Sequence, residues 1–146
     1  MKKAKAYLQS VRDGLLELRI LEESRAAMYA SLLPHSVEPK RVDVQESVKG
    51  DKMADFAAEL DRFDTAIPLA IQRIRTKKEL AICYISMMEN VNQRNLLVLY
   101  YLTPKIGGNT ILMSWEDVAS RLNYTLSHTH HIHRDALKAF EQVISE

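Results

Sequence analysis

Four histidines stand close together near the carboxyl end of the sequence, and they are the residues best suited to hold a metal ion: His128, His130, His131 and His133. On a helix, side chains three residues apart share a face, so two pairs of imidazoles have zinc-ligand spacing. No Cys or carboxylate stands at ligand spacing to complete a tetrahedral set, Asp135 being the nearest. We therefore expect no metal and no cofactor, and we interpret the histidines as solvated or facing a binding partner.

The other reactive side chains do not indicate an enzyme. The sequence has no glycine-rich phosphate loop, no paired-carboxylate motif and no nucleophile signature. Cys83 is the single cysteine, so no disulfide forms within the chain. Its apolar neighbours Ile82 and Tyr84 predict a small buried side chain. We therefore predict that the protein is not an enzyme.

The composition favours a helical protein. Hydrophobic side chains make up 47% of the 146 residues, and there are only 4 Gly and 4 Pro. Apolar residues recur in steps of three and four from Leu8 to Leu18, which predicts a helix over about residues 3–33. Pro34 ends this helix, because proline disfavours helix at the residue before it. The expected fold class is all-α.

A second long helix is expected over about residues 51–90, after a linker at residues 34–50. Its apolar residues form a heptad seam, which needs a partner helix at a shallow angle. The seam consists of Met53, Phe56, Leu60, Phe63, Ile67, Ala70, Ile74, Lys77, Ala81, Tyr84 and Met88, and only Lys77 breaks its apolar character. The first helix, folded back as a long antiparallel hairpin, or a second copy of the chain would cover it. Pro68 removes one helical hydrogen bond, so we expect a kink or a break near Ile67.

Residues 91–146 are predicted as a separate C-terminal domain. Asn92 is expected to cap a helix to Leu102, and a loop follows over residues 103–113. Ser114 then caps a helix with an acidic first turn, Asn123 and Tyr124 form a turn, and Thr125 caps a last helix to about Ile144. The side chains expected to face inward are Trp115, Val118, Ala119, Leu122, Thr129, Ile132, Ala136 or Leu137, and Phe140.

These last two helices resemble the region 4 helix-turn-helix of bacterial sigma-70 factors. Residues 114–125 read Ser-Trp-Glu-Asp-Val-Ala-Ser-Arg-Leu-Asn-Tyr-Thr, and residues 132–138 read Ile-His-Arg-Asp-Ala-Leu-Lys. The shared features are a capping Ser, an acidic pair, Ala at the inter-helix contact, Leu before the turn, and Ala-Leu-Lys late in the second helix. The two long helices upstream, with Asp-Lys-Met-Ala-Asp at residues 51–55, look like those of phage regulators of the RinA and ArpU type.

The resemblance implies a DNA-binding transcription regulator of phage or prophage origin, either a late-gene activator or a sigma-like factor. In that family the last helix enters the major groove of double-stranded DNA. The positions that would face bases are Leu126, Ser127, His128, His130, His131 and Arg134, and Arg121 and Lys138 would contact phosphates. Sigma factors favour Arg and Glu where Leu126 and Ser127 stand, so an ordinary sigma-factor promoter element is not the expected target.

The charge of this domain leaves a second interpretation open. Residues 92–146 hold five basic and five acidic side chains, whereas DNA binding usually needs a basic face. The alternative is a helical interaction module that contacts RNA polymerase or another phage protein without binding DNA. Under either interpretation we expect a cytoplasmic protein of the bacterial host with no membrane segment. RNA polymerase and a second copy of the chain, paired through the hairpin, are the further candidate partners.

Overall fold

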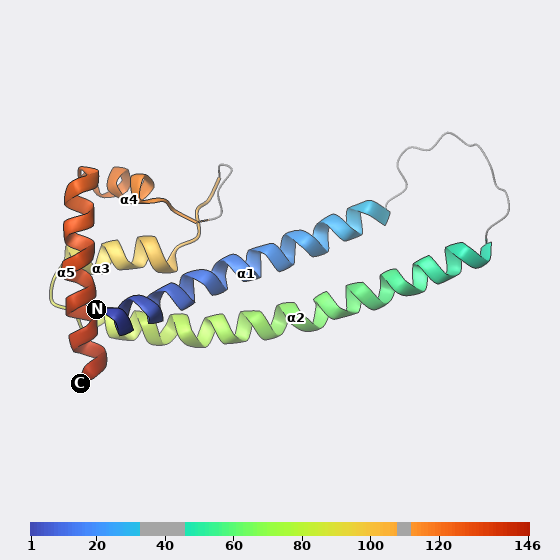
Figure 1. The fold of residues 1–146 in the computed structure, drawn as a ribbon, viewed down its shortest axis with the longest axis horizontal. Coiled ribbons are helices and arrows are strands. Elements are labelled where there is room, and N and C mark those ends of the chain that lie inside the picture. Colours follow the sequence, from blue (N-terminus) through green and yellow to red (C-terminus); the bar gives the residue numbers. More distant parts are fainter. Residues whose placement is uncertain (33–45, 108–111) are drawn as a thin grey trace. The chain divides into compact units, whose positions relative to one another are not determined.

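The computed structural model describes the backbone of residues 1–32, 46–107 and 112–146, and the side chains of 1–31, 52–107 and 112–146. Within these ranges the chain is all-α, as predicted, and no strand occurs (Figure 1). The elements are α1 (Lys2–Leu32), α2 (Glu46–Ser86), α3 (Val91–Leu97), the π-helical turn η1 (Val98–Leu102), α4 (Trp115–Leu122) and α5 (Leu126–Ser145). No helix in the described ranges has an apolar stretch long enough to cross a bilayer.

The chain divides into two compact units. The first unit joins residues 1–17 to residues 72–146, and the second contains residues 18–71. The segment that we predicted as a separate domain, residues 91–146, therefore shares its compact unit with the beginning of α1 and the end of α2. This unit contains all the residues that we predicted to contact DNA.

Phe140 on α5 lies at the centre of the first unit and is fully buried. The rings of Tyr7 on α1 and Tyr84 on α2 both lie 6.1 Å from its ring, between centroids. The rest of the buried apolar cluster comes from every helix of the unit: Ala4, Leu8, Val11, Ala81, Ile85, Met88, Leu96, Leu97, Tyr101, Leu102, Val118, Ala136 and Leu137. A single core therefore fixes α5 against helices that are distant in the sequence.

Inside each unit, α1 and α2 run in opposite directions. In the first unit, the Tyr7 hydroxyl donates to the backbone oxygen of Lys77 at 3.3 Å. Gly14 allows a close approach of the two helices, since an added Cβ would lie 3.0 Å from Cγ1 of Ile74. In the second unit, Arg25 Nε pairs with Asp64 Oδ1 at 2.7 Å. These contacts have the antiparallel direction of the predicted hairpin, whose complete form stays a prediction.

Three predictions about the long helices need correction. Helix α2 begins at Glu46, so residues 46–50 are helical and do not belong to the linker, and residues 33–45 lie outside the described part. Gly50 does not stop the helix, because one interior glycine costs only about 1 kcal/mol. The expectation near Ile67 was a kink or a break, and the break does not occur, because α2 continues through Pro68. Because Pro68 has no backbone N–H, the carbonyl of Asp64 loses its helical hydrogen-bond donor. Both residues lie on the exposed side of α2, where water can hydrate this carbonyl.

Two predicted burials are also wrong. Cys83 is exposed, because the buried face of this part of α2 passes through Ala81 and Ile85. Side chains on a helix point in directions set by the 3.6-residue repeat, so apolar neighbours in sequence do not imply a shared face. Met53, the first residue of the predicted seam, is 59% exposed. The seam positions between it and Ile74 are half-buried or buried.

Candidate nucleic-acid interface

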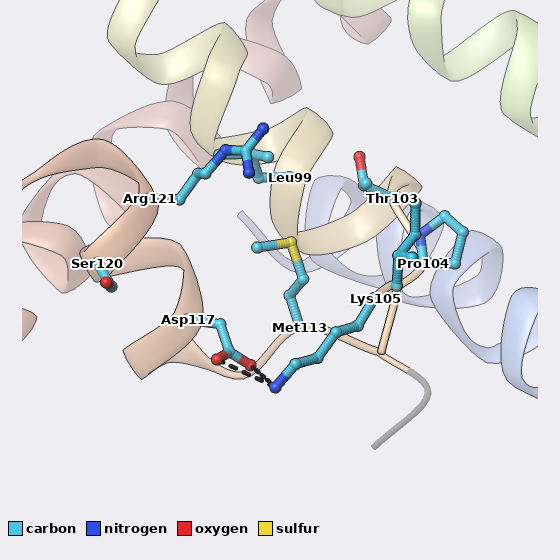
Figure 2. Close-up of a pocket in the computed structure, with 9 residues that line it drawn as sticks. Leu99, Thr103, Pro104, Lys105, Met113, Asp117, Ser120 and Arg121 are labelled. Carbon is cyan, nitrogen blue, oxygen red and sulfur yellow. Dashed lines mark hydrogen bonds and ion pairs between the residues drawn. The ribbon is translucent and has the colours of Figure 1, made fainter. Parts of the chain in front are cut away.

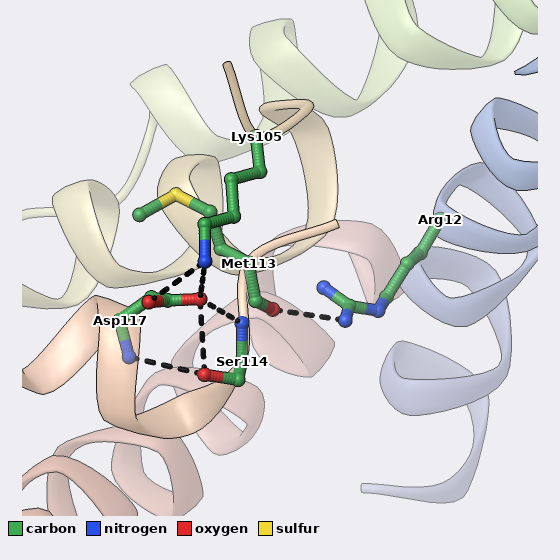
Figure 3. A network of polar contacts seen from close by, with 5 residues as sticks. All are labelled: Arg12, Lys105, Met113, Ser114 and Asp117. Carbon is green, nitrogen blue, oxygen red and sulfur yellow. Dashed lines mark hydrogen bonds and ion pairs between the residues drawn. The ribbon is translucent and has the colours of Figure 1, made fainter. Parts of the chain in front are cut away.

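Helix α4, the first helix of the predicted helix-turn-helix, starts with a reciprocal capping box (Figure 3). The backbone N–H of Asp117 donates to Ser114 Oγ at 3.2 Å, and the backbone N–H of Ser114 donates to Asp117 Oδ2 at 2.9 Å. Lys105 Nζ adds a hydrogen bond of 3.0 Å to the same carboxylate oxygen. The Ser114 N–H and the Lys105 ammonium hold the pKa of Asp117 below its ordinary value. The predicted cap at Ser114 is confirmed.

The turn between α4 and α5 is a left-handed C-cap followed directly by an N-cap. Asn123 has φ 59° and ψ 41°, a conformation that few side chains other than Gly and Asn tolerate. The backbone N–H of Tyr124 donates to the carbonyl of Ala119 at 2.9 Å. Thr125 then caps α5, because its Oγ1 accepts from the backbone N–H of His128 at 3.1 Å. Both predicted elements, the Asn123 turn and the Thr125 cap, are confirmed.

The inward face of the motif was also predicted correctly. Val118 and Ala119 on α4 are buried, and so are Thr129, Ala136, Leu137 and Phe140 on α5. Trp115, Leu122 and Ile132 are partly buried against the same cluster. Thr129 is the buried polar residue of this core, and its hydroxyl donates to the carbonyl of Thr125 at 2.9 Å. The short turn and these small and β-branched side chains let α4 and α5 pack closely.

The helix before the motif begins and ends differently from the prediction. Asn90, and not Asn92, is the N-cap of α3, since Asn90 Oδ1 accepts from the backbone N–H groups of Asn92 and Gln93. The last part of the predicted helix is the π-helical turn η1, which Thr103 closes by donating from Oγ1 to the carbonyl of Val98 at 2.8 Å. A π-turn is set by tertiary packing and has no simple sequence rule.

Arg12 on α1 joins η1 to the segment that leads into α4 (Figure 3). Its guanidinium donates to the carbonyl of Tyr100 from Nη1, and to the carbonyl of Met113 from Nη2 at 2.9 Å. The guanidinium carbon also lies 3.9 Å from the centre of the Tyr100 ring, which stacks on Trp115 at 3.7 Å between centroids. Arg12 therefore satisfies two carbonyls outside regular hydrogen bonding and fixes Trp115 through Tyr100.

His133 belongs to the core and not to the solvent-facing histidines, contrary to the prediction. Its Nε2 and the hydroxyl of Tyr101 share a hydrogen bond of 2.7 Å, and its ring lies 4.4 Å from that of Trp115. Burial lowers the pKa of His133 to about 4, and the nearby charges of Lys5 and His130 act in the same direction. Burial raises the pKa of Tyr101. Both side chains are thus neutral near pH 7, and the phenol donates when Nε2 is unprotonated.

All eight residues predicted to contact DNA are exposed: Arg121, Leu126, Ser127, His128, His130, His131, Arg134 and Lys138. Four of them follow one another in steps of four, three and four along α5, which places Ser127, His131, Arg134 and Lys138 on one stripe. This stripe lies opposite the buried face of α5. It is called the α5 stripe below.

The other four predicted residues lie apart from the α5 stripe. His128 contacts the ring of Tyr124 edge-on, with 4.8 Å between centroids. His130 lies against Trp115 at 5.2 Å, and Leu126, one turn before it, is 41% exposed. Arg121 comes from α4 and extends over Leu99 at the edge of a pocket of about 530 Å³ (Figure 2). Only the stripe therefore forms a continuous polar row.

The His131 and Arg134 side chains are joined within the α5 stripe. Arg134 Nη2 donates to His131 Nδ1 at 2.9 Å. An arginine has only donors, so His131 Nδ1 must be unprotonated in this arrangement, and the ring proton of the neutral form then lies on Nε2. Neither side chain has a carboxylate partner among the described residues. The pair is therefore free to donate hydrogen bonds to a ligand.

The histidine cluster does not form a metal-ligand set. His133 points into the core, while His130 and His131 extend from different sides of α5. In the described ranges, no three side chains of His, Cys, Asp or Glu lie close enough together to hold one ion. His130 and His133 are three residues apart, but they do not share an open face of α5.

The first unit is basic although its residues 92–146 carry equal numbers of basic and acidic side chains. Residues 1–17 and 72–90 contribute eight Lys and Arg side chains and four Asp and Glu side chains. With the five of each sign in residues 92–146, the first unit has thirteen basic and nine acidic side chains. Lys2, Lys3 and Lys5 are exposed, and Ala4 between them donates from its backbone N–H to Glu141 on α5 at 3.4 Å. Basic side chains from α1 therefore lie beside α5.

We compared the chain with protein-family models, with characterised proteins and with solved structures, and none of these comparisons gave a match. The interpretation of this surface therefore depends on its own geometry and charge.

Proposed function

We propose that this protein is a DNA-binding transcriptional regulator of phage or prophage origin, in which α4 and α5 act as a helix-turn-helix of the sigma-70 region 4 type. The observation that carries the proposal is the division of α5 into two faces. One face is buried in the core of the first unit, and the other presents the α5 stripe to solvent. A helix fixed in this way can enter a major groove without rearrangement.

The charge of the first unit supports this proposal. A domain made of residues 92–146 alone would be neutral and would bind phosphates weakly. The beginning of α1 and the end of α2 give the same unit an excess of four positive charges. Lys138 on the α5 stripe and Arg121 on α4 are the proposed phosphate contacts. Double-stranded DNA is the proposed ligand, and RNA polymerase and a second copy of the chain are candidate partners.

The first test is fluorescence-anisotropy titration of the full chain with duplexes from a random library and from prophage regions, at two salt concentrations. We expect selective binding that weakens steeply with salt, because each phosphate contact releases a counterion. The double variant His131→Ala/Arg134→Ala should lose the sequence preference. Lys52→Ala also removes one positive charge, but from an exposed site in the second unit, and serves as the matched control. Absence of binding by folded protein at low salt would refute the proposal.

A second candidate function is favoured by Leu126. This leucine is 41% exposed at the first position of α5, where an apolar side chain suits a protein partner better than a phosphate. In that alternative the helix-turn-helix binds RNA polymerase or another phage protein and does not bind DNA. Leu126→Ser would then weaken capture of purified polymerase, whereas His131→Ala/Arg134→Ala would not. A DNA-binding protein should show the reverse dependence in the duplex assay.

A further inference from the structure

The hydrogen-bonded side chains of His131 and Arg134 expose only hydrogen-bond donors to solvent. Because His131 Nδ1 accepts from Arg134 Nη2 at 2.9 Å, its neutral ring offers an N–H donor at Nε2. The guanidinium keeps further N–H donors, and neither residue offers a free acceptor. A ligand that fits this pair must present acceptors only.

The four bases differ in how many hydrogen-bond acceptors and donors they present in the major groove. Guanine presents two acceptors, N7 and O6, whereas adenine pairs its N7 acceptor with an amino donor, and cytosine presents an amino donor. Thymine presents one acceptor beside a methyl group. A donor-only fork therefore matches guanine and leaves an unfavourable donor–donor contact at adenine or cytosine.

The hydrogen bond to His131 also restricts the motion of Arg134. A free arginine side chain at a helix surface samples many rotamers, and their loss on binding weakens the complex. Arg134 is exposed, and its Nη2 is hydrogen-bonded to His131, one helical turn earlier on the α5 stripe. Its guanidinium is therefore oriented before any ligand arrives, as a bidentate contact requires.

We propose that Arg134 reads a guanine in the major groove and that His131 is a positioning residue that orients the Arg134 guanidinium for this contact. The inference rests on the proposed function, because it assigns a base to the middle of the α5 stripe. Lys138 lies one turn further along, and among the described residues no side chain orients it in this way, so it contacts phosphate without selecting a base.

The experiment starts with selection of bound sequences from a random duplex library by the full wild-type chain. We expect at least one position where guanine is required. In anisotropy titrations, replacing that guanine by adenine, or by 7-deazaguanine, which lacks the N7 acceptor, should weaken binding about 5- to 150-fold. Arg134→Lys keeps the charge but cannot make the bidentate contact, so it should lose most of this discrimination.

His131 has its own comparison. His131→Gln retains a side-chain oxygen that can accept from Arg134 and should keep the guanine preference. His131→Leu lacks an acceptor and should reduce the preference about 2- to 10-fold. The control Lys138→Ala should weaken binding to all duplexes equally and reduce the salt slope by about one. All three residues changed in this design are exposed, and thermal melting checks that each variant folds.

The outcomes separate this inference from the function on which it depends. Selective DNA binding without a required guanine, or with guanine discrimination that survives Arg134→Lys, would overturn the inference and leave DNA binding standing. Equal guanine preference in the Gln and Leu variants of His131 would overturn the positioning role alone. Failure of the wild-type chain to bind any duplex would refute both the function and the inference.

Discussion

Lowering the pH from 7.5 to 4.5 should destabilise the first unit through His133, which the core holds in its neutral form. The pKa of this histidine is about 4 in the folded chain, against 6.5 for an unperturbed side chain. Between these values the unfolded chain binds a proton that the folded chain does not bind. The contribution of neutral His133 to the free energy of unfolding is therefore fully present above pH 6.5 and is lost as the pH falls toward 4.

The size of this loss follows from the difference between the two pKa values. One pKa unit corresponds to about 1.4 kcal/mol, and most of the interval lies between pH 6.5 and 4.5. His133 keeps some contact with solvent, which screens part of the effect, so we expect a loss of about 2 kcal/mol by pH 4.5. That is a large fraction of the free energy of unfolding of a typical domain, which is roughly 5–15 kcal/mol.

Urea unfolding followed by Trp115 fluorescence measures this loss directly. Trp115 is the single tryptophan, and its ring lies 4.4 Å from His133, so its emission reports on the first unit. His133→Gln keeps a hydrogen-bonding side chain next to Tyr101 but does not titrate, and its stability should change about 2 kcal/mol less over the same pH range. Parallel pH profiles for the two proteins would refute the assignment of the loss to His133.

Three further substitutions test the local geometry of the motif. Asn123→Val should cost about 1–2 kcal/mol in urea unfolding, because a β-branched residue is strained at φ 59°, whereas Asn123→Gly should be nearly neutral. Ser114→Ala removes the α4 cap and should cost about 1 kcal/mol; an unchanged melting temperature would contradict the capping box. Arg12→Met leaves two carbonyls without their donor and should cost about 3 kcal/mol. Arg19→Met, in an exposed ion pair, is its control and should cost less than about 1 kcal/mol.

The caps of α4 and α5 and the turn between them were predictable because their determinants are local. Ser114, Asn123 and Thr125 act on backbone groups within a few residues, so their types alone locate the two helix starts and the turn. The inward face of α5 followed equally well from its 3.6-residue repeat. The residues that we predicted to contact DNA were expected to be exposed for the same reason, although the sequence does not divide them between the α5 stripe and its edges.

The features that escaped prediction depend on residues far apart in the chain. The roles of Arg12 and His133 come from contacts with Tyr100 and Tyr101, across 88 and 32 residues. An arginine between apolar positions and a histidine among histidines give no local sign of such partners. Cys83 was misplaced because its immediate neighbours are apolar, while the direction of its side chain depends on which face of α2 meets α1 and α5.

The division of the first unit between the two ends of the chain has a consequence for how the protein is made. Leu8 and Val11 leave the ribosome well before Leu137 and Phe140, which complete their core. The apolar face of α1 therefore lacks part of its core until α5 has been translated. Pairing within residues 18–71 shortens the effective separation between the two parts and lowers the entropy cost of closing that long loop. Substitutions that weaken the second unit should consequently slow the folding of the first, and nascent chains stalled before α5 should be recognised by chaperones.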